Sequence, residues 1–356
     1  MKKLSRDSVM KVWGKIRAFL KVDDALAPGR NRHVDALKGF TIICVVFIHA
    51  IQVNDPNHDN NRVYLSLFPW VMPLFMLLSG FILSSQFKHT LPGYLRKNTL
   101  RLIVPFFVWA IVSYVLHHAS QGVNPLVHLW SVIKAPGSGL WFLWVLFFNS
   151  LLLFSVLKLV RVKNWMRWEN YFVIGAIMLS RTASGDVFGL SEIKIFFPYY
   201  AAGFFAHKYY DVLKAKRKIF YAVALVAFPV LVFGWRRNEF PTFYPMLLQI
   251  FGETGIARLI VSIYKYVVAF TGMAFASLLL ELVRKARLYA VLCWVGTLSL
   301  DIYVCHATFI FLPGFGEGGW RYFSVGVMAI LGSLALTLLV LKRFRITRML
   351  FLGEHR

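Results

Sequence analysis

The chain has 356 residues, of which 58% are hydrophobic and 16% are charged, and its formal net charge is +24. Soluble domains carry about 25% charged and about 45–50% apolar residues, so this composition excludes an ordinary soluble enzyme. Long apolar runs separated by polar loops predict an all-α, polytopic membrane helical bundle. The net charge does not indicate nucleic-acid binding, because the basic residues gather in the loops between the apolar runs.

About ten transmembrane helices are expected in chain order. They fall near 36–53, 65–86, 101–118, 139–158, 165–180, 195–210, 218–235, 257–283, 289–312 and 322–341. If the N-terminus is cytoplasmic, the loops on that side hold 30 of the 40 lysines and arginines, and the opposite loops hold 8. Cytoplasmic loops carry such an excess, so both termini are predicted to be cytoplasmic.

Three regions follow from this count. Residues 1–33 form a basic segment whose pattern predicts an amphipathic helix on an anionic membrane surface, with a flexible tail as the alternative. Residues 34–343 form the transmembrane domain, and residues 344–356 form a basic cytoplasmic tail. Cys44, Cys293 and Cys305 lie in predicted spans without disulfide or metal-ligand spacing, so no metal site is expected.

The first predicted span carries the leading candidates for chemistry. His49 lies deep in an apolar run, where an ionisable side chain is costly and marks a candidate functional site. Lys38 precedes it by close to three helical turns, so the two residues share one face about 16 Å apart along the axis. Histidine titrates near neutral pH, which suits a general base. A structural histidine hydrogen-bonded between helices is the alternative.

Basic residues gather at the predicted cytoplasmic ends of the first and third spans. Guanidinium and ammonium groups clustered at helix starts suit a multiply charged phosphate ligand. The alternative is a role in membrane orientation and lipid-headgroup contact. The candidates for binding such a ligand are Arg32, Lys38, Arg96, Lys97 and Arg101.

Later spans add further polar candidates. Ser299, Tyr303 and His306 recur at helical spacing and form a polar stripe on one face of the ninth span. Trp141 lies at the start of the fourth span. In the second span, Ser79-Gly80 permits close approach of another helix.

The predicted outer loops have a different character, because they combine aromatic rings with carboxylates and amides. The loop 236–256 and its flank supply Trp235, Glu239, Tyr244 and Glu253. Such a set suits a sugar, whose apolar faces stack on rings while its hydroxyls form hydrogen bonds. The alternative is an aromatic belt at the membrane interface.

Together these residues resemble the acyltransferase-3 family of integral membrane acyltransferases, from about Arg32 to the tenth span. The most specific motif is Arg32-x-x-x-Asp35-x-x-Lys38-Gly39 followed by His49, which is similar to the family's basic residue, ten residues, then histidine. Supporting motifs are Leu78-Ser79-Gly80-Phe81, the run from Arg101 to Pro105, Leu140-Trp141-Phe142-Leu143, and the pattern Ser299, Tyr303, His306. The chain departs from the family in having lysine at position 38 instead of arginine, which loses the bidentate fork, and Asn98 in place of an arginine before Arg101.

The resemblance implies transfer of an acyl group, commonly acetyl from acetyl-CoA, to a hydroxyl of an extracytoplasmic polysaccharide or lipid-linked glycan. It gives His49 and Lys38 catalytic roles, and it gives Lys38 and the arginines a role on the acyl-CoA side. Candidates for contacts with the substrate or the oxyanion are Trp141, Ser299, Tyr303 and His306. Acyl-CoA is expected as a co-substrate and no cofactor as tightly bound.

The expected location is the bacterial cytoplasmic (inner) membrane. Expected partners are membrane lipids, the glycan acceptor and other glycan-assembly membrane proteins. Two alternatives stay open, namely a glycan or lipid-linked sugar transporter without acyl-transfer chemistry and a non-catalytic assembly protein.

Overall fold

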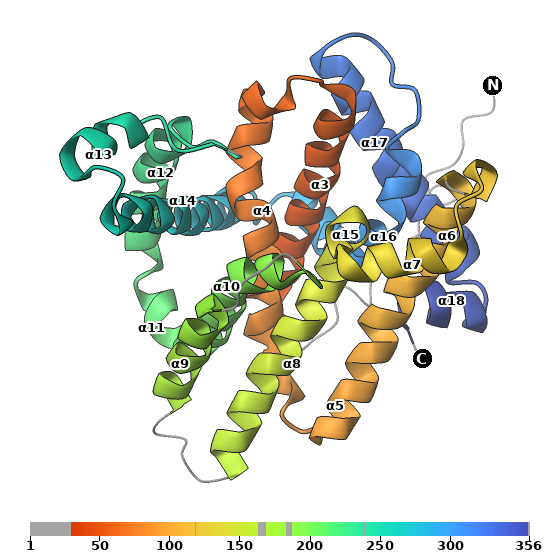
Figure 1. Ribbon diagram of the computed structural model, residues 1–356, viewed down its shortest axis with the longest axis horizontal. Helices are drawn as coiled ribbons and strands as arrows, with labels where there is room; N and C mark the ends of the chain where they lie inside the picture. Colours follow the sequence, from red (N-terminus) through yellow and green to blue (C-terminus); the bar gives the residue numbers. More distant parts are fainter. Residues whose placement is uncertain (1–29, 118, 163–168, 183–186, 238, 355–356) are drawn as a thin grey trace, which may run out of the picture.

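The computed structural model of the protein describes residues 30–354, except positions 118, 163–168, 183–186 and 238 (Figure 1). Within these residues the chain forms helices and no strands. The principal helices are α3 (Arg32–Asn54), α4 (Arg62–Phe81), α5 (Leu91–Asn98), α6 (Val104–His117), α7 (Pro125–Lys134), α8 (Trp141–Val162), α9 (Glu169–Thr182), α10 (Leu190–Lys208), α11 (Tyr210–Ala215), α12 (Arg217–Phe233), α13 (Tyr244–Phe251), α14 (Gly255–Leu282), α15 (Arg287–Thr297), α16 (Ser299–Phe309), α17 (Gly319–Ala335) and α18 (Arg345–Leu352).

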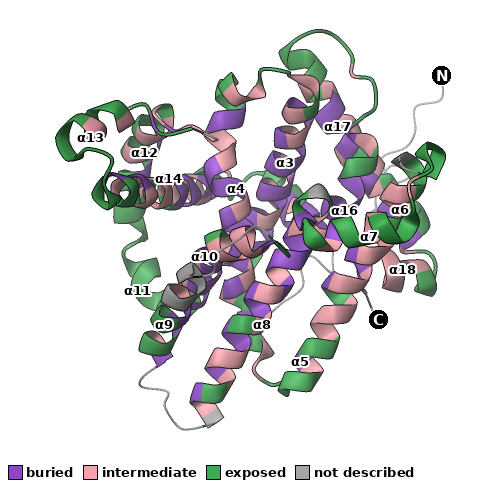
Figure 2. Ribbon diagram, in the orientation of Figure 1, coloured by how far each residue is buried: buried purple, intermediate pink, exposed green. Residues whose placement is uncertain are grey.

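The first of these helices, α3, is the centre of the bundle. It packs against α4, α14, α15, α16 and α17, and Figure 2 shows it mostly in the colour of buried residues. Its N-terminus is capped by Asn31, whose side chain accepts a hydrogen bond from the Val34 amide. Asp35 in the first turn is buried and receives two hydrogen bonds from Arg30, at 2.9 and 3.1 Å. The site residues on α3 therefore sit on a helix that is held on several sides.

Two helix pairs pack backbone against backbone because they place glycines at the contact. Gly39 on α3 lies against the Leu292 carbonyl and Gly296 of α15, and Gly296 in turn lies against the Asp35 carbonyl. Gly80 on α4 and Gly203 on α10 make the second pair in the same way. A side chain at any of these positions would collide with the backbone of the neighbouring helix. Small residues bring membrane helices together in this manner, and the prediction for Ser79-Gly80 agrees with it.

The ninth predicted span, 289–312, is interrupted. It consists of α15 and α16, which meet at Leu298 with a bend of 81°. Two other helices contain wider π-helical turns, at Thr99–Ile103 between α5 and α6 and at Leu336–Leu341 after α17. The bend and the first of these turns both border the cavity described below, which agrees with the tendency of such irregularities to lie at functional sites.

The helices long and apolar enough to cross a membrane are fewer than predicted. Six single helices of the described chain meet that test, or seven elements if the bent pair of α15 and α16 is one span. The predicted count of about ten is therefore not confirmed, because α9, α10 and α12 stand outside this set. The orientation of the termini stays a prediction, and the predicted N-terminal amphipathic helix lies outside the described residues, as does most of the segment 1–33.

Candidate functional site

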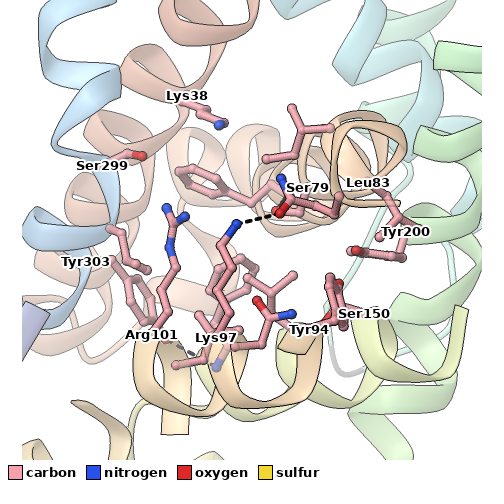
Figure 3. A pocket seen from close by; sticks show the side chains of 18 residues that line it. Lys38, Ser79, Leu83, Tyr94, Lys97, Arg101, Ser150, Tyr200, Ser299 and Tyr303 are labelled. Atoms are coloured by element: carbon pink, nitrogen blue, oxygen red, sulfur yellow. Dashed lines mark hydrogen bonds between the residues drawn. The ribbon is translucent and has the colours of Figure 1, made fainter. Parts of the chain in front are cut away.

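A cavity beside α3 gathers five of the ten predicted site residues (Figure 3). It has a volume of about 130 Å³, and its walls come from α3, α4, α5, the first π-turn, α8, α10 and α16. The predicted residues that line it are Lys38, Lys97, Arg101, Ser299 and Tyr303. Residues more than 260 positions apart in the chain thus share one wall.

One side of the cavity is cationic. Lys38 comes from α3, Lys97 from α5 and Arg101 from the π-turn, and Figure 3 shows their side chains approaching the cavity from separate elements. The Lys97 ammonium donates a hydrogen bond of 2.6 Å to the Gln86 side chain, which also lines the cavity. None of the described residues that line the cavity is acidic. Three cations without a carboxylate in the described lining favour an anionic ligand over a cationic one.

The opposite side carries hydroxyl groups, which the sequence did not indicate. Tyr94, Ser150 and Tyr200 line it from α5, α8 and α10, and all three are buried. The Tyr94 side chain contacts both Ser150 and Tyr200, and its ring stacks on Phe154 with 3.8 Å between ring centroids. Apolar side chains complete the lining, among them Phe75, Leu83, Leu102, Phe142 and Leu146. The cavity is therefore suited to a ligand with an anionic end and an apolar or amide-bearing arm.

Tyr303 lines this cavity and carries a hydroxyl group that can donate a hydrogen bond. Its hydroxyl oxygen accepts a hydrogen bond of 3.3 Å from the Phe142 amide, and the two rings meet edge to face at 5.4 Å. Because the oxygen is already an acceptor, its own hydrogen is left to donate to a group in the cavity. Such a buried donor suits a carbonyl oxygen on which negative charge develops.

His49 lies outside the cavity lining, farther along α3. Its ring contacts the ring of His306 on α16, with 5.2 Å between centroids and 35° between planes. The Nδ1 atom of His306 lies 2.6 Å from the Tyr303 carbonyl oxygen, so Nδ1 carries the hydrogen and donates it there. The rings of His306 and Tyr303 are 5.7 Å apart. Tyr303 therefore lines the cavity and also holds the partner of His49 through its backbone carbonyl.

These residues form a path of contacts beside α3, from the cavity through Tyr303 to the two histidines. The cations lie at one end of it, Tyr303 in the middle and the two histidines at the other end.

Comparison with known proteins agrees with the motifs that line this path. The sequence model of the acyltransferase-3 family, described as an acyltransferase domain, matches residues 31–342. This chain belongs to the acyltransferase-3 family. No curated protein and no solved structure matches it.

The acyltransferase-3 match covers every site residue named so far, but the structure does not bring all of them to the cavity. Arg32 and Arg96 are exposed on α3 and α5 and do not line it. Trp141 is half-buried beside the cavity wall, where its ring packs on Phe196 with 5.1 Å between centroids. Their predicted roles in binding donor or acceptor thus have no support from the cavity geometry.

The aromatic residues proposed to stack on sugars are already partnered. Trp235 is buried and its ring lies 5.8 Å from that of Phe68. Tyr244 stacks on Phe240 at 3.7 Å. In the same region, Arg237 donates a 2.6 Å hydrogen bond to the Tyr64 hydroxyl and lies over the Phe68 ring. This cluster fixes α4 to the segment after α12, so packing explains these rings without a sugar.

Proposed function

We propose that this membrane acyltransferase transfers an acetyl group from acetyl-CoA to a hydroxyl of an extracytoplasmic glycan in the bacterial cytoplasmic membrane. The observation that carries the proposal is the cavity whose lining, among the described residues, holds three cations and no carboxylate and is joined through Tyr303 to the pair His49 and His306. Coenzyme A matches this layout in its chemistry, since it has several phosphates at one end and a long amide-bearing arm with a thioester at the other.

The donor phosphates bind Lys38, Lys97 and Arg101. Charge-assisted hydrogen bonds to phosphate oxygens are stronger than neutral ones, and the guanidinium of Arg101 adds a bidentate contact. The amides of the arm have partners in the hydroxyl groups of Tyr94, Ser150 and Tyr200. The arm extends past Tyr303 and brings the thioester towards His49.

His49 serves as the general base. It takes the proton of the acceptor hydroxyl as the oxygen attacks the thioester carbonyl carbon, and the Tyr303 hydroxyl donates to the carbonyl oxygen as charge develops there. The tetrahedral intermediate collapses with cleavage of the carbon–sulfur bond. The CoA sulfur then takes the proton from His49, so the histidine ends the cycle neutral. His306 contacts His49 with its ring and holds a fixed tautomer through its hydrogen bond to Tyr303.

The test is the acetyl content of surface glycan in cells that express wild type or His49→Ala at equal levels, with transfer from acetyl-CoA by membranes measured in parallel. We expect wild type to transfer acetyl groups and His49→Ala to lose transfer. Equal acetylation by both proteins would overturn the proposal. A transporter would keep moving glycan in the His49→Ala variant, so glycan export measured in the same cells separates the two functions.

A further inference from the structure

The chain does not end at the last membrane helix but folds back as a hook, residues 342–354, which follows the region matched by the family apart from Lys342. The sequence predicted a basic tail for residues 344–356 and did not indicate this structure. Helix α18 forms most of the hook and packs on α6 and α16. The Trp109 indole on α6 donates a 3.1 Å hydrogen bond to the Phe351 carbonyl, and the two rings meet edge to face at 5.6 Å. The hook is therefore an integral part of the bundle.

The end of the hook packs against Arg101, one of the three cations of the cavity lining. Helix α18 ends at Gly353, which has left-handed dihedral angles (φ 66°, ψ 22°). A Cβ atom at Gly353 would lie 2.6 Å from the Arg101 Cα and 2.8 Å from its carbonyl carbon. Only glycine combines this conformation with this approach. The backbone of Gly353 thus sits directly on the backbone that carries the Arg101 side chain into the cavity.

The other contact of the hook reaches the helix that carries Ser299 and Tyr303. The Lys342 ammonium lies 2.8 Å from the Asp301 carboxylate and 3.0 Å from that of Glu354. Asp301 is buried, and it stands on α16 between the two cavity residues. Burial would lower the pKa of Lys342, but Asp301 and Glu354 outweigh this and raise the pKa, so the lysine keeps its charge. One lysine therefore ties the end of the hook to α16.

From these two contacts we propose that the hook is a positioning element for the donor site, which sets Arg101 on the π-turn relative to Tyr303 on α16. The inference rests on the proposed binding of acyl-CoA in the cavity. A π-turn has a weaker backbone hydrogen-bond pattern than a regular helix, so its residues depend on outside contacts for a fixed position. The hook supplies such a contact at Arg101 and joins it through Lys342 to Asp301 on α16.

The decisive variant is Gly353→Ala, with Gly122→Ala as its matched control. Gly122 also has a positive φ, of 70°, but a Cβ there meets nothing within 4 Å. We expect Gly353→Ala to raise the KM for acetyl-CoA about tenfold with kcat changed less than threefold, and Gly122→Ala to leave both unchanged. In an Arg101→Gln background, Gly353→Ala should have no further effect on KM, because interacting residues do not act additively.

A second measurement tests the hook without relying on activity. In Arg101→Cys protein in native membranes, the rate of maleimide labelling should change at least fivefold on adding Gly353→Ala and stay constant on adding Gly122→Ala. Unchanged labelling would overturn the role of the hook. An effect of Gly353→Ala on KM that is equally large in wild type and in the Arg101→Gln background would also overturn it. Absence of acetyl transfer by wild type, with labelling still sensitive to Gly353→Ala, would instead overturn the proposed function and leave the hook contact to Arg101 standing.

Discussion

Lys38 and His49 lie at the two ends of one face of α3. The surroundings of these two residues differ in kind. At the Lys38 end the structure assembles an open cavity from many elements, with three cations, several hydroxyl groups and apolar walls. At the His49 end it places two imidazole rings in contact, one of them held by backbone carbonyl groups of its own helix. A spread-out charged site suits the binding of a large anion, whereas a tight pair suits the movement of one proton. Under the proposed function we expect the Lys38 end to set the affinity for the donor and the His49 end to set the rate, and mutations should separate the two.

The largest effect is expected at the imidazole end. His49→Ala should lower kcat by roughly 10²–10⁴-fold, the range for loss of a general base, and leave the KM for acetyl-CoA within about threefold of wild type. Initial rates of transfer by membranes over a range of acetyl-CoA concentrations measure both constants. His49→Gln is the matched control for packing, because it keeps a polar side chain at the contact with His306 and cannot act as a base near pH 7. A large rise in KM with unchanged kcat would remove the division of roles.

Tyr303 lies between the two ends, so substituting it tests whether they are coupled. Tyr303→Phe removes the hydroxyl that accepts from the Phe142 amide but keeps the ring and the backbone carbonyl that holds His306. Loss of one oxyanion donor costs roughly 10²–10³-fold in kcat, and we expect an effect of this size. The same assays provide the measurement, with Tyr64→Phe, which removes a buried hydroxyl outside the cavity lining, as the control. Equal kcat for Tyr303→Phe and wild type would show that the hydroxyl does not touch the reacting carbonyl.

At the cavity end the expected effect is on affinity. Arg101→Gln should raise the KM for acetyl-CoA about 10–100-fold, because one charge-assisted contact is worth about 1.5–3 kcal/mol. The KM of wild type should also rise with salt, and this dependence should weaken in the variant, since screening acts on the charge that was removed. Arg101→Lys should recover part of the affinity because it restores the charge but not the bidentate geometry. A KM equal to that of wild type in Arg101→Gln would show that the cavity is not the donor site.

How much of this could be predicted from the sequence depends on whether the signal lies within one helix or between several. The apolar runs predicted the helices, and the spacing of Lys38 and His49 predicted two separate positions along α3. The hydroxyl wall was missed, because Tyr94, Ser150 and Tyr200 come from three helices and none has a local pattern that sets it apart. The bend at Leu298 was missed for a related reason, since the run 289–312 contains no proline and its length fits one continuous span. The predicted count of ten membrane spans is not supported where the apolar runs form short helices, such as α9 with its 14 residues.

Arg96 gives the sharpest contrast with Arg101, and the smallest expected effect. Both lie in the basic run before α6, and the sequence predicted that both bind the donor. The structure places Arg101 at the cavity and Arg96 on the exposed side of α5, away from its lining. Arg96→Gln should therefore change the KM for acetyl-CoA less than threefold, because a surface charge acts only through a screened field. Measured beside Arg101→Gln in the same membranes, a tenfold rise for Arg96→Gln would mean that the donor phosphates bind outside the cavity. A change confined to Arg101 would mean that the π-turn, and not the basic run as a whole, selects the donor.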